Sequence, residues 1–192
     1  MCQGCQNKVV ERAAYRVDHV GSFLRPKELV EAREKFSKGE LSQEELTKVE
    51  DKVIAELVEK QIANGLKGVT DGEFRRAYWH LDFFWGLNGV EHVQGEKGYP
   101  FKGIETKPDT AKVSGKISGE NHPFVAHYKF LRDLVADKKD VTVKLTIPSP
   151  SQLYFELIRT EDHIKGYEKF YPTFEELKDA IVAAYKQVIA DL

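Results

Sequence analysis

Residues 68–84 read GVTDGEFRRAYWHLDFF, and this stretch decides how the rest of the chain is interpreted. The apolar run at 66–70 predicts a buried strand, and the Asp-Gly-Glu that follows predicts a turn at the C-terminal end of that strand. Such a turn requires only the glycine. The carboxylates of Asp71 and Glu73, the arginine pair and the aromatic cluster around a histidine therefore suggest a binding site. On residue types alone, an ordinary strand-ending turn fits equally well.

The composition of the chain indicates a single folded domain. With 192 residues, of which 41% are apolar and 31% charged, the chain can bury a sizeable core. Its formal net charge of -2 gives no basic face for nucleic acid. No apolar run approaches the roughly 18 residues of a membrane span, and the N-terminus lacks the apolar core of a signal peptide. We therefore expect a cytoplasmic protein that binds neither nucleic acid nor membrane.

Residues 1–16 are predicted to be a flexible tail that precedes the domain at 17–192. Both cysteines, Cys2 and Cys5, lie in this tail as a C-x-x-C pair. A structural zinc requires four ligands, and no further Cys or His lies close enough in sequence to complete the set. A redox C-x-x-C normally follows a strand and opens a helix, whereas this pair precedes any element. The pair is therefore interpreted as part of a disordered tail.

The apolar pattern beyond the tail predicts strands that alternate with helices. Strands are predicted at 17–23, 66–70, 111–118 and 141–147. Helices are predicted at 26–36, 42–64, 123–136, 152–159 and 173–192, with capping boxes formed by Ser42 with Glu45 and by Thr173 with Glu176. The stretch at 74–109 is predicted to be a long loop with room for a hairpin.

This order of elements indicates an α/β fold with a parallel sheet. Four strand-helix units are the first half of a TIM (β/α)8 barrel, a fold of eight such units and typically ~250 residues. Because the chain ends within a helix, we expect it to be truncated, with a downstream half missing. The competing interpretation is a complete small open α/β sheet.

Polar side chains lie at or near the C-terminal ends of the predicted strands, where a barrel gathers its site. These residues are Ser22, Asp71, Glu73, Lys116 and Ser149. A fixed carboxylate beside free backbone amides and a hydroxyl matches the ammonium and carboxylate groups of an amino acid. The residues are therefore compatible with an amino-acid site at this end of the sheet.

Several motifs, in order along the chain, carry a resemblance to a known family. They are DHVGSFLRP at 18–26, VEKQIANGL at 58–66, VTDGEFRR at 69–76, WHLDFF at 79–84 and KLTIPSPSQLY at 144–154. Together they resemble the short, single-barrel relatives of cobalamin-independent methionine synthase, over nearly the whole chain from about residue 17. The resemblance implies the N-terminal half of a zinc-dependent barrel that moves a methyl group to the thiolate of homocysteine, which makes methionine.

The resemblance also implies roles for individual residues. The motif at the first strand holds the carboxylate end of the amino acid and maps onto Val20, Gly21 and Ser22. The glutamate of the D/H-G-E motif binds the amino group and maps onto Glu73. Other residues belong to the pattern or are candidates to line the site, with no assigned role: Arg25, Asp71, Arg75, Arg76, Trp79, His80, Ser149 and Tyr154. For His80, a structural, hydrogen-bonded histidine is the favoured interpretation.

The chain also departs from the family pattern. In the family, the zinc ligands and the catalytic histidine lie on later strands, and none of those motifs occurs in this sequence. The zinc of the complete family barrel is therefore expected to lack its ligands here, and the catalytic residues stay unassigned. The tryptophan that packs on the folate-type methyl donor is also not found, which leaves Tyr154 or Phe155 to stack in its place.

Three functions stay open from the sequence. In the first, the chain is part of a methyltransferase that binds homocysteine or methionine. Alone it would be inactive, and a second half-barrel would be needed to complete it. The second is a non-catalytic, self-associating half-barrel that retains part of an amino-acid site. The third is an unrelated α/β enzyme in which Glu73 is a general base and Arg75 or Arg76 grips an anion, and the resemblance counts against it.

Overall fold

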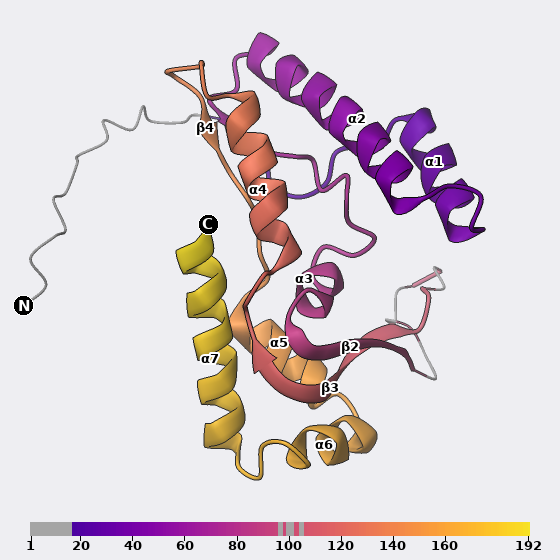
Figure 1. Cartoon of the computed structure of the whole chain (residues 1–192), viewed down its shortest axis with the longest axis vertical. Coiled ribbons are helices and arrows are strands. Elements are labelled where there is room, and N and C mark those ends of the chain that lie inside the picture. The colour runs from indigo at the N-terminus through magenta and orange to yellow at the C-terminus, as the bar shows by residue number, and fades with distance from the viewer. Residues whose placement is uncertain (1–16, 96–97, 99–101, 104–105) are drawn as a thin grey trace, which may run out of the picture.

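The computed structural model describes residues 17–95, 98, 102–103 and 106–192 of the chain (Figure 1). The predicted tail with Cys2 and Cys5 lies outside the described residues. Within them the chain is a mixed α/β fold of seven helices and four strands, whose strands form two separate two-stranded sheets. None of the described helices is long and apolar enough to cross a membrane.

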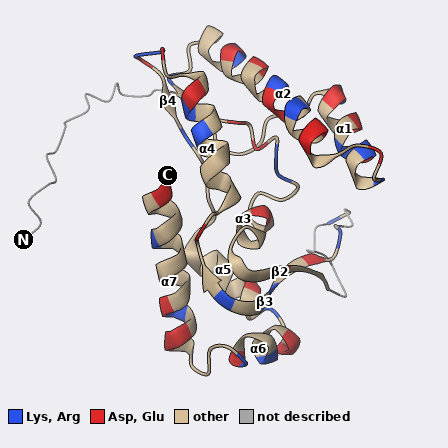
Figure 2. Cartoon of the chain, in the orientation of Figure 1, with Lys and Arg blue, Asp and Glu red and all other residues tan. Residues whose placement is uncertain are grey.

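The first two helices, α1 (Lys27–Ser37) and α2 (Gln43–Ala63), form as the sequence predicts and lie side by side (Figure 1). The capping box at the start of α2 makes both of its hydrogen bonds. Glu45 N donates to Ser42 Oγ at 3.2 Å, and Ser42 N donates to Glu45 Oε2 at 2.8 Å. Figure 2 shows acidic and basic residues interspersed along these helices. Lys52 of α2 and Glu28 of α1 form an ion pair at 2.7 Å.

Helix α2 packs against a parallel pair of short strands. Strand β1 (Gly68–Val69) pairs in parallel with β4 (Thr142–Val143). The predicted strands at 66–70 and 141–147 are thus both present and parallel, but the sequence pattern does not predict their direct pairing. Lys144 N extends the ladder by donating to the carbonyl of Val69 at 2.9 Å. Helix α4 (Pro123–Leu134) packs with α2 and these strands around a core of apolar side chains. That core contains Leu29, Val53, Ile54, Val58, Val69, Phe74, Leu131 and Val135.

The predicted strand at 17–23 is wrong, because this segment forms no ladder in the structure. Its apolar residues Val17 and Val20 are exposed, so no packing partner holds them against a sheet. The segment is instead attached by single hydrogen bonds. Phe23 N donates to the carbonyl of Gly72 at 3.2 Å, and Lys144 Nζ donates to Asp18 Oδ1 at 2.5 Å.

The predicted strand at 111–118 exists, but its expected place in a four-stranded parallel sheet is wrong. Strand β3 (Asp109–Ser118) pairs antiparallel with β2 (Asn88–Gln94), which lies in the stretch predicted as a loop with room for a hairpin. Sequence neighbours joined by one connection pair readily in this way. The described strands therefore do not show the four parallel strands of a half-barrel.

The hairpin packs into a second apolar core with the remaining helices, as Figure 1 shows. These helices are α3 (Leu81–Trp85), α5 (Pro150–Leu157), α6 (Glu161–Glu168) and α7 (Phe174–Asp191). Thr173 caps the start of α7, since its Oγ1 accepts a hydrogen bond from Glu176 N at 3.3 Å. The fully buried side chains of this core include Leu81, Phe83, Phe84, Leu153, Leu157, Leu177 and Val188.

The contact between the end of β3 and α7 leaves no room for a side chain at Gly119. A Cβ atom there would lie 2.3 Å from the carbonyl oxygen of Ala184 and 2.8 Å from Val188 Cγ2. We expect Gly119→Ala to lower the free energy of unfolding by about 1–3 kcal/mol, because the backbone of α7 must shift. Chemical denaturation measures this change. The matched control is Gly115→Ala in β3, where the nearest atom would lie at 3.5 Å; an equal loss in both variants would contradict the interpretation.

Candidate functional site

Hydrogen bonds between side chains and the backbone hold the turn after β1. Gln61 of α2 accepts a hydrogen bond from Thr70 N at 3.0 Å and donates to the carbonyl of Thr70 at 2.8 Å. Asp71 Oδ1 accepts from Glu73 N at 2.9 Å, and Thr70 Oγ1 accepts from Gly72 N at 3.1 Å. The sequence-predicted Asp71 therefore shapes the turn with its side chain, and Glu73 is the carboxylate that the turn presents.

Two consecutive residues of this turn adopt left-handed backbone conformations. Gly72 has a φ of 66° and Glu73 has a φ of 56°. The positive φ of Gly72 favours glycine, and a Cβ there would also lie 2.4 Å from Leu57 Cδ2, so the Leu57 side chain on α2 would have to shift. For Glu73 the left-handed conformation costs roughly 1–2 kcal/mol. Backbone strain of this kind is concentrated at functional sites.

The Glu73 carboxylate is buried and joins three segments that are far apart in sequence. Ser22 Oγ donates to Glu73 Oε2 at 2.8 Å, which brings together the two residues that the motifs singled out. Thr146 Oγ1 donates to Glu73 Oε1 at 2.9 Å, and Arg76 Nη1 lies 3.5 Å from the same oxygen. Sequence reasoning missed Thr146, although it lies within the quoted KLTIPSPSQLY motif.

Arg76 is buried beside this carboxylate and is held on several sides. Its Nη2 donates to the carbonyl of Thr146 at 2.7 Å, and its Nη1 donates to the carbonyl of Trp79 at 3.3 Å. The guanidinium carbon lies 4.5 Å from the centre of the Phe124 ring, a cation–π contact. Arg25 closes the turn from outside, because its Nη2 donates to the carbonyls of Glu73 at 3.1 Å and Arg76 at 2.6 Å. Arg76 and Arg25 thus both contact the Glu73 turn.

Arg75 pairs with carboxylates of α2 and not with Glu73. It pairs with Glu50 Oε2 at 3.2 Å and with Asp51, both on α2, and its guanidinium carbon lies 5.1 Å from the Phe130 ring centre. Burial raises the pKa of Glu50 in spite of the neighbouring positive charges of Arg75 and Arg33. The expectation that Arg75 lines the site is therefore not supported by its contacts.

The other sequence-predicted residues lie at varying distances from this centre. Ser149 Oγ accepts from Gln152 N at 3.3 Å and so caps α5, while Tyr154 is half-buried and packs against Phe155 and Phe174. His80 is buried, with its ring centre 4.6 Å from that of Trp79, and burial lowers its pKa. Val20 is exposed, and a Cβ at Gly21 would meet no atom within 4 Å, so there is open space beside the backbone next to Ser22.

The expectation that Lys116 converges on the site is wrong. Lys116 is on β3, which belongs to the hairpin rather than to the parallel pair. Its Nζ donates to the carbonyl of Phe170 at 2.6 Å and lies 4.4 Å from the Tyr171 ring centre. The residue therefore attaches the hairpin to the loop between α6 and α7.

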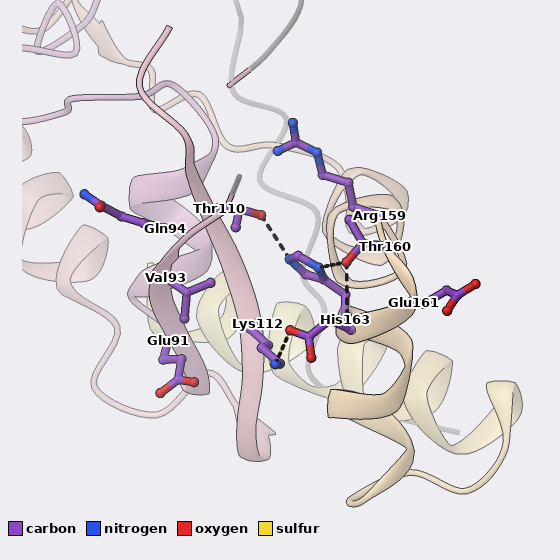
Figure 3. Close-up of a pocket in the computed structure, with 11 residues that line it drawn as sticks. Glu91, Val93, Gln94, Thr110, Lys112, Arg159, Thr160, Glu161 and His163 are labelled. Carbon is purple, nitrogen blue, oxygen red and sulfur yellow. Dashed lines mark hydrogen bonds and ion pairs between the residues drawn. The ribbon is translucent and has the colours of Figure 1, made fainter. Parts of the chain in front are cut away.

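A separate pocket of about 770 Å³ lies between the hairpin and the start of α6 (Figure 3). His163 is at its base, with Nε2 at 3.2 Å from Thr110 Oγ1 and Nδ1 at 2.7 Å from Thr160 Oγ1. Lys112 pairs with Asp162 at 2.6 Å at the opening. Because these polar groups bond to one another, they fasten α6 to the hairpin, and the Glu73 centre is the stronger candidate for a binding site.

The described residues do not fit a zinc ion. In the ranges that the structure describes, there is no group of three or more His, Cys, Asp or Glu side chains that could hold a metal. A zinc site of the kind that the family resemblance implies would need three or four such ligands. We therefore derive no chemical step through a metal from these residues.

The fold and site define a mixed α/β protein with a buried, oriented carboxylate at the C-terminal end of a parallel strand. Comparison with known proteins identifies relatives of this chain. It is 41% identical over 186 residues to the Bacillus subtilis protein YxjH, and 40% identical over 177 residues to YxjG of the same organism. The matches cover 97% and 91% of this chain but 47% and 46% of the relatives. The chain thus spans about half the length of these relatives, and no protein-family model matches it.

One solved structure indicates the family, and a second shares the fold. A putative vitamin-B12 independent methionine synthase from Listeria monocytogenes is 37% identical, with a TM-score of 0.71 over 93% of this chain and 48% of that chain. A B12-independent methionine synthase from Shewanella sp. W3-18-1, solved in complex with selenomethionine, shares the fold at 22% identity, with a TM-score of 0.57 over 79% of this chain and 40% of that chain. The chain is therefore a relative of the cobalamin-independent methionine synthases, over about half of their length.

The arginine pair after the turn, Arg75 and Arg76, affects the pKa of a histidine on α4. The pKa of His127 is lowered to about 4, first by burial and then by the positive charges of Arg75 and Arg76. Between about pH 6.5 and pH 4 the unfolded chain binds a proton at this residue that the folded chain does not. We therefore expect the free energy of unfolding to fall as the pH is lowered through this window, and His127→Gln to reduce that dependence. Denaturation at several pH values measures it, and an unaltered slope in the variant would contradict the assignment.

Proposed function

We propose that this chain is part of a cytoplasmic methyltransferase of the cobalamin-independent methionine synthase type, which transfers a methyl group to the thiol of homocysteine. The observation that carries the proposal is the buried Glu73 carboxylate, which accepts a hydrogen bond from Ser22 Oγ at 2.8 Å. The chain that holds it matches 48% of the Listeria methionine synthase structure. The selenomethionine in the Shewanella neighbour supports an amino acid as the ligand of this site.

The proposed amino-acid clamp follows from the groups around Glu73. An anionic carboxylate at the end of a strand binds the ammonium group of an amino acid by a charge-assisted hydrogen bond. The exposed Ser22 hydroxyl and the backbone beside Gly21 would bind the carboxylate group of the same ligand. A Cβ at Gly21 would meet nothing within 4 Å, so a ligand has room to approach there. Homocysteine and methionine both carry these two groups.

The alternative in which Glu73 is a general base beside an anion-gripping arginine has less support. Arg75 is engaged with Glu50 and Asp51 on α2, and Arg76 is engaged with the carbonyls of Thr146 and Trp79. Neither guanidinium is directed at an open anion site. For the folate-type methyl donor, Phe155 offers the more exposed ring, because Tyr154 packs against Phe174.

We further propose that residues 17–192 form the first half of a TIM barrel that needs additional strand-helix units. Strands β1 and β4 form a pair with no further strand on either side among the described residues. Near the site, Val20 and Trp79 are exposed and Leu24 is 97% exposed. Further units, on the same polypeptide or on a second chain, would cover these side chains and pair with the open strand edges.

The proposed function is tested on the protein isolated from its native source together with any partner. We expect it to bind methionine and to methylate homocysteine, and Glu73→Gln to lower methionine affinity at least about tenfold, since a hydrogen bond to a charged group contributes about 1.5–3 kcal/mol. Calorimetry and a methylation assay measure these two properties. The matched control is Glu91→Gln, which changes a carboxylate beside the separate pocket.

The outcomes separate the alternatives. Methionine binding without methyl transfer would favour the non-catalytic half-barrel module. Unchanged methionine affinity in Glu73→Gln would contradict the clamp itself.

The half-barrel proposal predicts how the 192-residue chain behaves alone. We expect it to self-associate or to bind a hydrophobic dye, because the apolar side chains near the site lack a cover. Leu24→Glu should reduce both effects, whereas the control Phe36→Glu, at the far end of α1, should not. Size-exclusion chromatography and dye fluorescence measure these properties. A monomer with little dye binding would count against the proposal.

A further inference from the structure

The two oxygens of the Glu73 carboxylate have different surroundings. Oε1 receives the Thr146 hydroxyl at 2.9 Å and lies 3.5 Å from Arg76 Nη1. Oε2 receives the Ser22 hydroxyl at 2.8 Å. Arg76 is buried and Thr146 is half-buried, whereas Ser22 is exposed. One oxygen is thus anchored by the fold, and the other is bonded by a group that can move.

Hydrogen-bond chemistry fixes the direction of the Thr146 proton. Arg76 Nη1 lies 3.3 Å from Thr146 Oγ1, and a guanidinium can only donate. The hydroxyl oxygen of Thr146 therefore accepts from Arg76, and its own proton is left for the carboxylate of Glu73. Arg76 also holds the backbone of Thr146 by donating from Nη2 to its carbonyl at 2.7 Å.

The position of Thr146 is further set by the parallel strand pair. Lys144 N, two residues earlier, donates to the carbonyl of Val69 at 2.9 Å, so this segment is held in register with the strand that leads into the Glu73 turn. Thr146 and Glu73 therefore lie in the segments that directly follow two paired parallel strands, β4 and β1. The hydroxyl is aimed by the fold and not by a flexible side chain.

We propose that Thr146 is a positioning residue of the amino-acid site: it holds Glu73 Oε1, with the help of Arg76, so that Oε2 is presented to the primary ammonium group of the ligand. The ammonium replaces the Ser22 hydroxyl on Oε2, and the released hydroxyl turns to the carboxylate group of the ligand. This inference rests on the proposed function and names the residue that orients its central carboxylate, together with the oxygen that recognises the ligand.

The test compares two ligands that differ only in the amino group: methionine and 4-(methylthio)butanoate. Thr146→Val keeps the shape of the side chain and removes the hydroxyl, and Thr146→Ser restores the hydroxyl. We expect Thr146→Val to weaken methionine about tenfold, as for the loss of a hydrogen bond to a charged group, while the affinity for the analogue stays the same. Thr146→Ser should retain the preference for methionine. Calorimetry on the protein isolated with any partner measures the affinities of the unaltered protein and of both variants for both ligands.

The readout is the ratio of the two affinities, which a general structural defect does not change. Equal weakening of both ligands in Thr146→Val would overturn the positioning role. If Thr146→Val does not fold, Ser22→Ala gives an independent test. Ser22→Ala should lower the affinity for both ligands by the same factor, because both carry the carboxylate that Ser22 is proposed to contact. Loss of the amino-group preference in Ser22→Ala would overturn the assignment of the two oxygens. If the unaltered protein binds neither ligand, the proposed function fails and this inference fails with it.

Discussion

The left-handed turn at Gly72 and Glu73 is the constraint on which the site depends. Helix α2 imposes it from one side, because Leu57 leaves no space for a Cβ at Gly72 and Gln61 holds both backbone groups of Thr70. The turn then directs the Glu73 carboxylate toward two segments that are distant in sequence. Its hydrogen bonds to Ser22 and Thr146 connect the N-terminal segment and the segment after β4 to one buried carboxylate. The backbone conformation thus determines the chemistry that the side chains present.

A short strand followed by an irregular turn leaves buried carbonyl groups without ladder partners, and arginines provide the donors. Arg33 donates to the carbonyl of Phe74 at 2.8 Å, and Arg25 donates to those of Glu73 and Arg76. Buried carbonyls require such partners, and the planar guanidinium satisfies several of them at once. The Arg-Arg pair after the turn therefore has two distinct tasks, since Arg75 binds α2 while Arg76 supports the carboxylate.

The sequence predicted those features that depend on local patterns. The capping box and apolar stripe of α2 were sufficient for that helix, and the motifs identified Ser22 and Glu73 as neighbours. Pairing between strands was predicted less well. The strand β2 has the sequence NGVEHVQ, whose few apolar residues give little alternation, so its antiparallel pairing with β3 was not foreseen. Thr146 was missed because nothing in its neighbours along the chain indicates that its hydroxyl meets Glu73 in space.

The site lies at the border of the two apolar cores, and this position links ligand binding to assembly. Arg76 contacts Phe124, which belongs to the core around the hairpin, while Phe74 in the same turn belongs to the core around β1 and β4. The exposed Val20 and Leu24 flank Ser22, so the uncovered apolar surface adjoins the groups proposed to bind the ligand. A partner that covers this surface would also immobilise the Ser22 segment, which lowers the entropic cost of binding a ligand. By thermodynamic linkage, an amino acid bound at Glu73 would in turn stabilise the assembled form.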